Sequence, residues 1–273
     1  MTGGRADAGW RRADILRLAI RFADLWAVDP HQMADETYGP SIHMESMAGL
    51  TVIDGIGMLH ELENRLATMI PAHRHELVRV LVDPPAAFLE TTVVGPVTGE
   101  YAQAALWWLV GDPTGSGRPG HVVDEVGWFQ WADRKADSVA SRGTIPPDDG
   151  RRRGTADWYE RMVTEAAAAF DADAAAAASH YLSADVVATH VGHAETHGLD
   201  AVLGVIARFL AAGPRWSIEV SRVIGDGAVV AVLFNLGDGR SETRGTLVAT
   251  LDSADAVHSV RLYLGWDRLA PDS

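Results

Sequence analysis

The chain contains no cysteine, and this absence excludes several kinds of chemistry at once. Without thiols there is no disulfide framework, no thiolate nucleophile and no zinc site built on cysteine ligands. No apolar run approaches the ~20 residues that a membrane-spanning helix needs. Residues 1–12 are polar and lack the apolar centre of a signal peptide. We therefore expect a soluble, cytoplasmic protein.

Positive charge is also scarce. Lysine and arginine number 23 against 37 acidic residues, so the formal net charge is −14. An acidic surface repels phosphate backbones, which argues against a nucleic-acid partner. The one basic run, Arg151 to Arg153, lies in a loop-like stretch and is interpreted as a solvated linker.

The motifs that hold common cofactors or nucleophiles are missing as well. There is no glycine-rich phosphate loop, no Gly-x-Ser-x-Gly elbow and no dinucleotide fingerprint after a strand. We therefore expect no cofactor. Hydrophobic residues make up 47% of the chain and charged residues 22%, an ordinary globular composition. The 273 residues suffice for two domains of ~100–150 residues each.

What the sequence does contain is an internal repeat. Similar short segments recur in the same order at a spacing of about 143 residues. The region 141–156 contains Pro146, Pro147 and Gly150 and is predicted to be an exposed linker. The expected domains are therefore 10–140 and 157–270. The matching segments are 79–83 with 222–226, 26–29 with 170–173, and Pro71 with Pro214; both halves also end on similar segments, 131–134 and 266–268.

In each copy, the spacing of apolar residues predicts helices followed by strands. Apolar residues at helical spacing, such as Ile15, Leu18, Phe22 and Trp26, indicate an amphipathic first helix. This order is typical of an α+β fold, here a curved antiparallel sheet closed by helices into a cone. The first copy is expected to have helices at 12–26, 30–38 and 55–69, the last capped by Asp54, and strands at 41–47, 75–82, 86–94, 102–110 and 121–131. The second is expected to have helices at 158–178 and 199–212 and strands at 186–189, 217–224, 228–236, 243–251 and 256–265.

This order of elements, and the segments within it, resemble the nuclear transport factor 2-like superfamily, in particular its SnoaL-like branch. The resemblance covers residues 12–134 and 157–269, and the branch includes polyketide cyclases, ketosteroid isomerases and epoxide hydrolases. It implies two fused cone-shaped barrels, each around a small-molecule pocket, paired within the chain as a pseudo-dimer. Whether the chain forms a further oligomer stays open.

The resemblance also implies candidate catalytic residues. In the isomerase and epoxide-hydrolase branches, a short strand carries an acidic base that points into the cone, and Glu45 matches that position. His43 lies two residues earlier, on the same face of the strand. Tandem epoxide hydrolases use a second acid, near the position of Glu76. Two acids across a small cavity could divide the roles of acid and base.

Other positions depart from the isomerase pattern. The first helix has no tyrosine near Phe22, and the second acid expected near Gly127 has no clear match, although Asp124 and Glu125 are close. A straightforward ketosteroid isomerase is therefore disfavoured.

In the second copy, Thr189 stands where Glu45 stands in the first, beside His190, the best catalytic candidate there. A zinc site of His190, His193 and His197 is the alternative, but the stretch is loop-like and the family usually works without metal. We therefore expect no metal site.

Aromatic residues offer either core packing or a ligand-binding surface. The candidates for ligand contact are Phe22, Trp26, Trp107 and Trp128 in the first copy, and Thr189 in the second.

Two functions follow from the sequence. One is a cofactor-independent enzyme that cyclises, isomerises or opens an epoxide of a hydrophobic polyketide- or terpenoid-like molecule. The other is a non-catalytic small-molecule-binding or scaffold protein.

Overall fold

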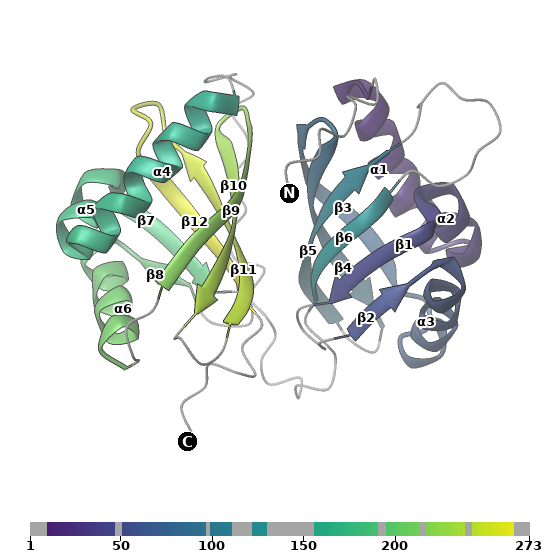
Figure 1. Cartoon of the computed structure of the whole chain (residues 1–273). Coiled ribbons are helices and arrows are strands. Elements are labelled where there is room, and N and C mark those ends of the chain that lie inside the picture. Colours follow the sequence, from purple (N-terminus) through teal and green to yellow (C-terminus); the bar gives the residue numbers. More distant parts are fainter. Residues whose placement is uncertain are drawn as a thin grey trace. The chain divides into compact units, whose positions relative to one another are not determined.

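The computed structural model describes residues 10–46, 51–96, 99–110, 122–129, 156–190, 195–212, 217–237 and 242–264. The chain divides into two compact units, Met1–Val139 and Ala140–Ser273. Each unit holds one six-stranded sheet with helices against it (Figure 1). Within the described part, no helix is long and apolar enough to cross a membrane.

The first unit begins with helices and ends with a strand meander. Its sheet has the order β2-β1-β6-β5-β4-β3. All neighbouring strands are antiparallel except β1 and β6, which are parallel. The elements are α1 (Arg12–Trp26), α2 (Pro30–Thr37), β1 (Tyr38–Ser46), β2 (Thr51–Asp54), α3 (Ile56–Met69), β3 (Arg74–Asp83), β4 (Ala86–Gly95), β5 (Gly99–Leu109) and β6 (Val122–Phe129).

The second unit repeats this topology, with the order β8-β7-β12-β11-β10-β9 and a parallel pair formed by β7 and β12. The prediction of an α+β chain with two similar sheets is confirmed, but the sheets are mixed, not wholly antiparallel. The elements are α4 (Ala156–Ala172), α5 (Ala174–Tyr181), β7 (Leu182–His190), β8 (Thr196–His197), α6 (Leu199–Ala212), β9 (Ser217–Asp226), β10 (Val229–Gly237), β11 (Glu242–Leu251) and β12 (Val257–Leu264).

Local chemistry explains two differences from the predicted elements. The helix expected over 158–178 is two helices, because the Asp173 side chain accepts hydrogen bonds from the backbone N–H groups of Ala175 and Ala176 and starts α5. Asp54 is not a helix cap. It ends β2, and Gly55, with a φ of 83°, makes the turn into α3.

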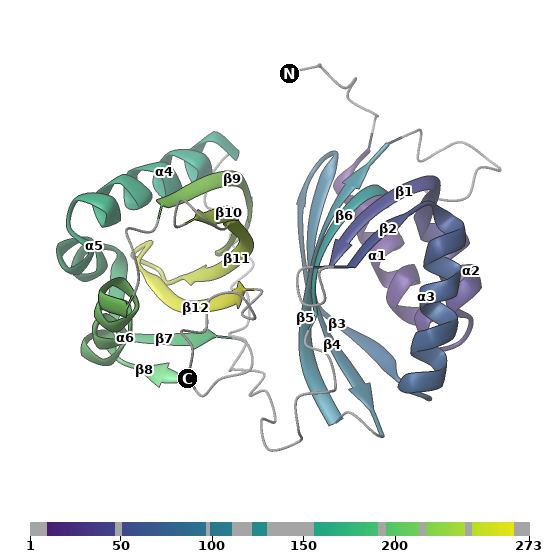
Figure 2. The same ribbon diagram turned by 60° about the horizontal axis from the view of Figure 1, so that its bottom comes forward.

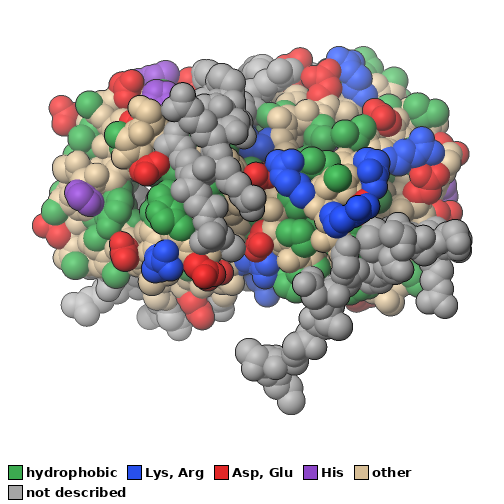
Figure 3. Space-filling view, turned by 90° about the horizontal axis from the view of Figure 1, so that it is seen from above, with side chains coloured by type: hydrophobic (Ala, Val, Ile, Leu, Met, Phe, Trp, Pro, Cys, Tyr) green, Lys and Arg blue, Asp and Glu red, His purple; other side chains and the backbone are tan. Residues whose placement is uncertain are grey.

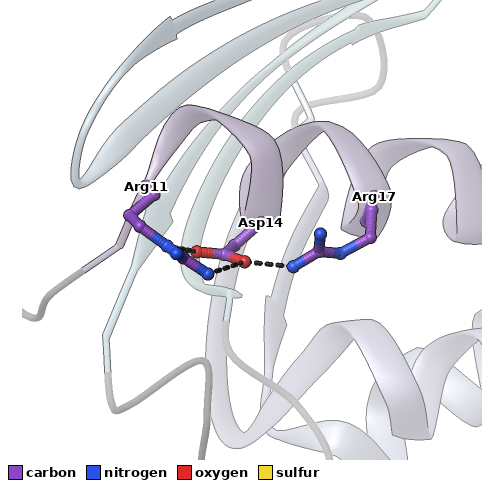
Figure 4. A network of polar contacts seen from close by, with 3 residues as sticks. All are labelled: Arg11, Asp14 and Arg17. Carbon is purple, nitrogen blue, oxygen red and sulfur yellow. Dashed lines mark hydrogen bonds and ion pairs between the residues drawn. The ribbon is translucent and has the colours of Figure 1, made fainter.

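The first turn of α1 is tied by ion pairs, not by a side-chain cap. Asp14 accepts hydrogen bonds from Arg11, at 2.8 Å from its Nε, and from Arg17 (Figure 4). The hydrogen bond from Arg11 holds the pKa of Asp14 below its usual range. The exposed side of this helix also carries Arg12 and Arg21. Basic side chains gather over the first unit on the face drawn in Figure 3.

In each unit the helices cover the same side of the sheet, as Figure 2 shows for α1, α2 and α3 and for α4, α5 and α6. We call this side the inner face. In the first unit it is packed with buried residues such as Ile15, Phe22, Ile42 and Met44. Alternate residues of each strand point to the other side, the outer face.

In the second unit, Tyr159 of α4 lies on the inner face directly over Gly225 of β9. A Cβ atom at Gly225 would stand 2.1 Å from Cγ of the Tyr159 ring. The Tyr159 hydroxyl donates a 2.5 Å hydrogen bond to the carbonyl oxygen of Gly227. The glycine therefore leaves room for the ring that joins α4 to the sheet.

We expect Gly225→Ala to lower the free energy of unfolding by about 1–3 kcal/mol, because the added methyl group overlaps the Tyr159 ring. Gly204→Ala is the matched control. This glycine lies inside α6, where an added Cβ has only Arg208 Nη1 at 3.7 Å, so the change should stabilise the helix by about 0.5–1 kcal/mol. Urea unfolding of both variants shows whether each change lowers or raises the free energy of unfolding. Equal effects would show that Tyr159 does not require the glycine.

Candidate functional site

One row of residues crosses the inner face of the first sheet and carries an acid at its centre. Ala87, Trp107, Glu125, Met44 and Ile53 lie directly opposite one another on β4, β5, β6, β1 and β2. Directly opposite residues share a face of the sheet. Glu125 therefore points toward the helices, between Trp107 and Met44, and only 3% of it is exposed.

Two donors hold the Glu125 carboxyl in place. Tyr38 Oη donates a 2.7 Å hydrogen bond to Oε2, and Trp107 Nε1 donates a 2.8 Å bond to the same oxygen. Burial raises the pKa of Glu125 to about 7, although these two hydrogen bonds oppose the rise. Both donors bind Oε2, so Oε1 is the oxygen that these two hydrogen bonds do not occupy.

A second acid comes from the helix layer. Glu63 of α3 is 3% exposed, and its Oε2 accepts a 2.8 Å hydrogen bond from Trp26 Nε1. Burial raises the pKa of Glu63 to about 8, and the charge of Glu125 adds to this rise. Burial also raises the pKa of Tyr38 well above 10, which keeps its hydroxyl a neutral donor. The interior thus holds two coupled carboxyls that titrate near neutral pH.

Aromatic rings surround the two acids. The Phe22 ring centroid lies 4.9 Å from that of Trp26 and 5.0 Å from that of Trp107. His75 of β3 stacks on Trp26, with centroids 3.3 Å apart and planes at 11°. Burial lowers the pKa of His75 well below 6.5, so this imidazole is neutral. Neither of its ring nitrogens has a hydrogen-bond partner in the described part of the chain.

Three of the predicted ligand contacts, Phe22, Trp26 and Trp107, therefore lie together beside the acids. Their contact with a ligand stays a prediction. The Trp128 backbone belongs to β6, but its side chain lies outside the described part of the structure.

The expectation that Glu45 points into the cone is wrong. Ile42 and Met44 of β1 are buried against the helices, so alternation turns His43 and Glu45 to the outer face. Their side chains are 42% and 28% exposed. His43 Nδ1 lies 2.6 Å from Asp54 Oδ1, and Nε2 lies 3.3 Å from Glu45 Oε1. The hydrogen bond to Asp54 raises the pKa of His43, and the weaker contribution of Glu45 adds to this rise.

Glu76 does not form a pair with Glu45. It lies opposite Thr92 on the outer face, and Arg74 holds it at 2.9 Å. The strand order places β1 and β3 four strand spacings apart, which is roughly 19 Å. Catalytic roles for His43, Glu45 and Glu76 stay predictions, but they would have to act on the outer face and separately.

The second unit carries no acid in the corresponding row. The residues there are Val230, Ala249, Val260, Ala188 and Thr196. Val260 thus stands at the position that Glu125 holds in the first unit.

The other second-copy candidates lie around this row. Thr189 is opposite Arg261, on the outer face, whereas His190 is opposite Leu262, on the inner face. His193 is outside the described residues, and the His197 side chain is 65% exposed beside Glu195. Among the described residues, no group of three or more metal-ligating side chains is placed to hold a metal ion.

The sequence interpretation did not name Glu63, and it left Glu125 unassigned close to the position expected for a second acid. Glu63 stands on the apolar stripe of α3 between Leu59 and Leu66, where a carboxylate breaks the pattern. That interruption was a usable signal. For Glu125 the sequence offered only its position near the expected second acid, because its face depends on which residue of β6 pairs with β1 and β5.

The two raised pKa values predict that stability falls as pH rises. In the unfolded chain these carboxyls titrate near 4.5, so between pH 5 and about 7 the folded state binds more protons. Each acid then lowers the free energy of unfolding by up to about 1.4 kcal/mol per pH unit. We expect Glu63→Gln to flatten this slope, and Glu61→Gln, an exposed change on the same helix, to leave it unchanged. Urea unfolding at several pH values gives the slopes, and an unaltered slope in Glu63→Gln would contradict the raised pKa.

Comparison with solved structures finds several proteins with distant similarity. An NTF2-like protein of unknown function from Burkholderia pseudomallei is 18% identical, with a TM-score of 0.35, over 39% of this chain and 89% of that one. A SnoaL-like protein of unknown function from Burkholderia thailandensis is 13% identical, with a TM-score of 0.37, over 45% and 99%. A Catenulispora acidiphila protein with a ketosteroid isomerase-like fold, in complex with trimethylamine, is 11% identical, with a TM-score of 0.35, over 47% and 93%. Values this low indicate nothing about activity.

Comparison with curated proteins finds no match. Among protein families, the model of the SnoaL-like domain matches residues 163–258, which lie within the second unit. The first unit has the same strand order and the same parallel pair. The second unit therefore has a SnoaL-like fold over the matched residues, and the first unit has the same strand order.

Proposed function

We propose that the interior of the first domain is a site of acid–base catalysis on a hydrophobic small molecule. The observation that carries this proposal is the pair of buried carboxyls, Glu63 and Glu125, with pKa values raised to about 8 and about 7. A catalytic acid or base works best when its pKa lies near the working pH. Carboxyls with strongly perturbed pKa values cluster at functional sites.

The two acids take different roles because their pKa values differ. Glu125, the stronger acid, is the base that removes a proton through Oε1. Glu63 keeps its proton to a higher pH and is the acid that returns one. Tyr38, Trp107 and Trp26 donate to the Oε2 atoms and hold both carboxyls in position. Such fixed donors favour the charged base without reorganisation during the reaction.

The surroundings indicate the kind of substrate. Phe22, Trp26 and Trp107 offer apolar ring surface, and the neutral His75 has one ring N–H that can donate to an oxygen atom and one ring nitrogen that can accept from a hydroxyl. We infer a hydrophobic, oxygenated substrate of the polyketide or terpenoid kind. Proton transfer on it would drive cyclisation, isomerisation or epoxide opening, with no cofactor.

The second candidate function is ligand binding without catalysis. The tight packing of the first interior, where Trp107 is 0% and Phe22 is 4% exposed, weighs against catalysis there and leaves a binding or scaffold role elsewhere in the chain. A substrate would have to displace side chains there before it met the acids.

Replacing the base tests these alternatives. We expect Glu125→Gln to lower kcat at least ~100-fold, because glutamine keeps the hydrogen bonds from Tyr38 and Trp107 but cannot take a proton. Turnover is measured by mass spectrometry with a panel of polycyclic polyketides, steroids and terpenoid epoxides. Glu61→Gln is the exposed control. Loss of turnover in Glu45→Gln together with full activity in Glu125→Gln would move the site to the outer face. If a compound binds the parent and the variants equally and the parent does not convert it, the chain is a binding protein.

The pH dependence of kcat/KM provides an independent check. The base must be deprotonated, so the rate should rise as pH passes about 7. The acid must be protonated, so the rate should fall as pH passes about 8. The expected profile is a narrow bell, and Glu63→Gln should remove its alkaline limb. A flat profile between pH 6 and 9 would rule out this division of roles.

A further inference from the structure

Two histidines lie ring to ring between α2 and α3 of the first domain. His31 belongs to the first turn of α2 and His60 to α3, and the two helices pack against each other (Figure 1 and Figure 2). The ring centroids are 4.6 Å apart, and the ring planes meet at 46°. Both side chains are partly buried, so packing limits the movement of the rings without sealing them from water.

Each ring has a polar partner on the opposite helix. His31 Nε2 lies 2.9 Å from Asn64 Oδ1 of α3, and because this oxygen only accepts, the nitrogen carries the hydrogen. His60 Nε2 lies 3.0 Å from Asp35 Oδ1 of α2, although not in line for a hydrogen bond. The negative charge of Asp35 favours a hydrogen on that nitrogen as well. Both imidazoles therefore keep their lone pair on Nδ1.

The two Nδ1 atoms are not occupied by other groups. Among the described residues, His31 and His60 make no hydrogen bond or ion pair through Nδ1. Neither Nδ1 belongs to the buried atoms that lack a partner, so both are reached by solvent. His43 is different, because both of its ring nitrogens already lie beside carboxylates. The α2–α3 pair thus presents two accessible lone pairs on adjacent rings.

This arrangement has the features of a metal site. Histidines that bind a metal through one nitrogen usually donate the other N–H to a carboxylate, a carbonyl oxygen or water. An imidazole nitrogen binds Zn²⁺ or Cu²⁺ at about 2.1 Å, which puts the ion about 3.2 Å from the ring centroid. Two rings on one ion, at angles from square to tetrahedral, then have centroids about 4.5–5.2 Å apart. The observed 4.6 Å lies in this range, so the helices already hold the rings at the required separation.

The second domain lacks the pair. The helix caps Asp29 and Asp173 align α2 with α5, and two residues after each cap stand His31 and Ala175. Five residues after the positive-φ glycines that precede the third helices stand His60 and Leu203. The pair is therefore a feature of the first domain and not of the shared scaffold.

We propose that His31 and His60 form a two-imidazole site for a borderline divalent transition metal, Zn²⁺ or Cu²⁺, which links α2 to α3. Asn64 and Asp35 orient the rings through Nε2, and the ion binds the two Nδ1 atoms. In the described part of the chain no third ligating side chain joins them, so water fills the remaining positions. No described hydrogen bond or ion pair connects these rings to Glu63 or Glu125, and the site does not depend on catalysis by those acids.

Zinc titration of the full chain, without an added histidine tag, tests the proposal. Isothermal titration should show saturable binding of one Zn²⁺ per chain, and Mg²⁺ should not compete, because it prefers oxygen ligands. Zn²⁺ should also raise the melting temperature of the parent, since the ion joins two helices in the folded state only. Absence of saturable Zn²⁺ binding would overturn the proposal.

Replacing each histidine locates the site. His31→Ala and, separately, His60→Ala should each weaken Zn²⁺ binding at least ten-fold and abolish the rise in melting temperature. His197→Ala removes a histidine that is 65% exposed in the second domain and should leave binding unchanged, as should Glu125→Gln. Thermal unfolding without metal verifies that each variant is folded.

Electron paramagnetic resonance of bound Cu²⁺ gives a second measurement that does not depend on stability. The parent should show hyperfine splitting from two ring nitrogens, and each histidine variant should show splitting from one fewer. Unaltered affinity and unaltered splitting in both variants would place the metal elsewhere and overturn the proposal.

Discussion

Alternation along the strands decides which residues of this chain can meet a ligand. Successive side chains of a strand point to opposite faces, and only one face of each sheet is covered by helices. Met44 and Glu125 share a row, so both lie inside, whereas Glu45 is one residue away and lies outside. A shift of one residue in the β1–β6 pairing would exchange these roles. The register of this parallel pair therefore determines the chemistry of the first interior.

Burial then determines what the interior acids can do. Glu63 and Glu125 are removed from water, and the described hydrogen bonds reach only one oxygen of each. Desolvation raises both pKa values, and their mutual repulsion opposes ionisation of both together. The outer-face acids behave differently. The Glu76 side chain is 46% exposed and lies 2.9 Å from Arg74, so it meets both water and a counter-charge.

The two domains share a scaffold and differ in the side chains that fill it. The strand order, the parallel pair and the positive-φ glycine before the third helix occur in both domains. These features depend on backbone geometry and turn chemistry, which side-chain replacement on the inner face leaves intact. The replaced residues are those that fill the interior, such as Trp107 against Ala249. One fold thus holds a central acid in one copy and a valine at the same position in the other.

The sequence alone determined the fold class, the repeat and most of the elements. Helical spacing placed α1 and α6 at their observed bounds, and the apolar strands fell within a few residues of theirs, because these features depend on neighbours in the chain. The short strands β2 and β8, the parallel pairs and the inner position of Glu125 were decided by tertiary structure. Each depends on contacts between segments far apart in the chain, and an alternating pattern does not say which face the helices will cover. The resemblance to known enzymes pointed to Glu45, but the packing of Ile42 and Met44 against the helices turned that residue outward.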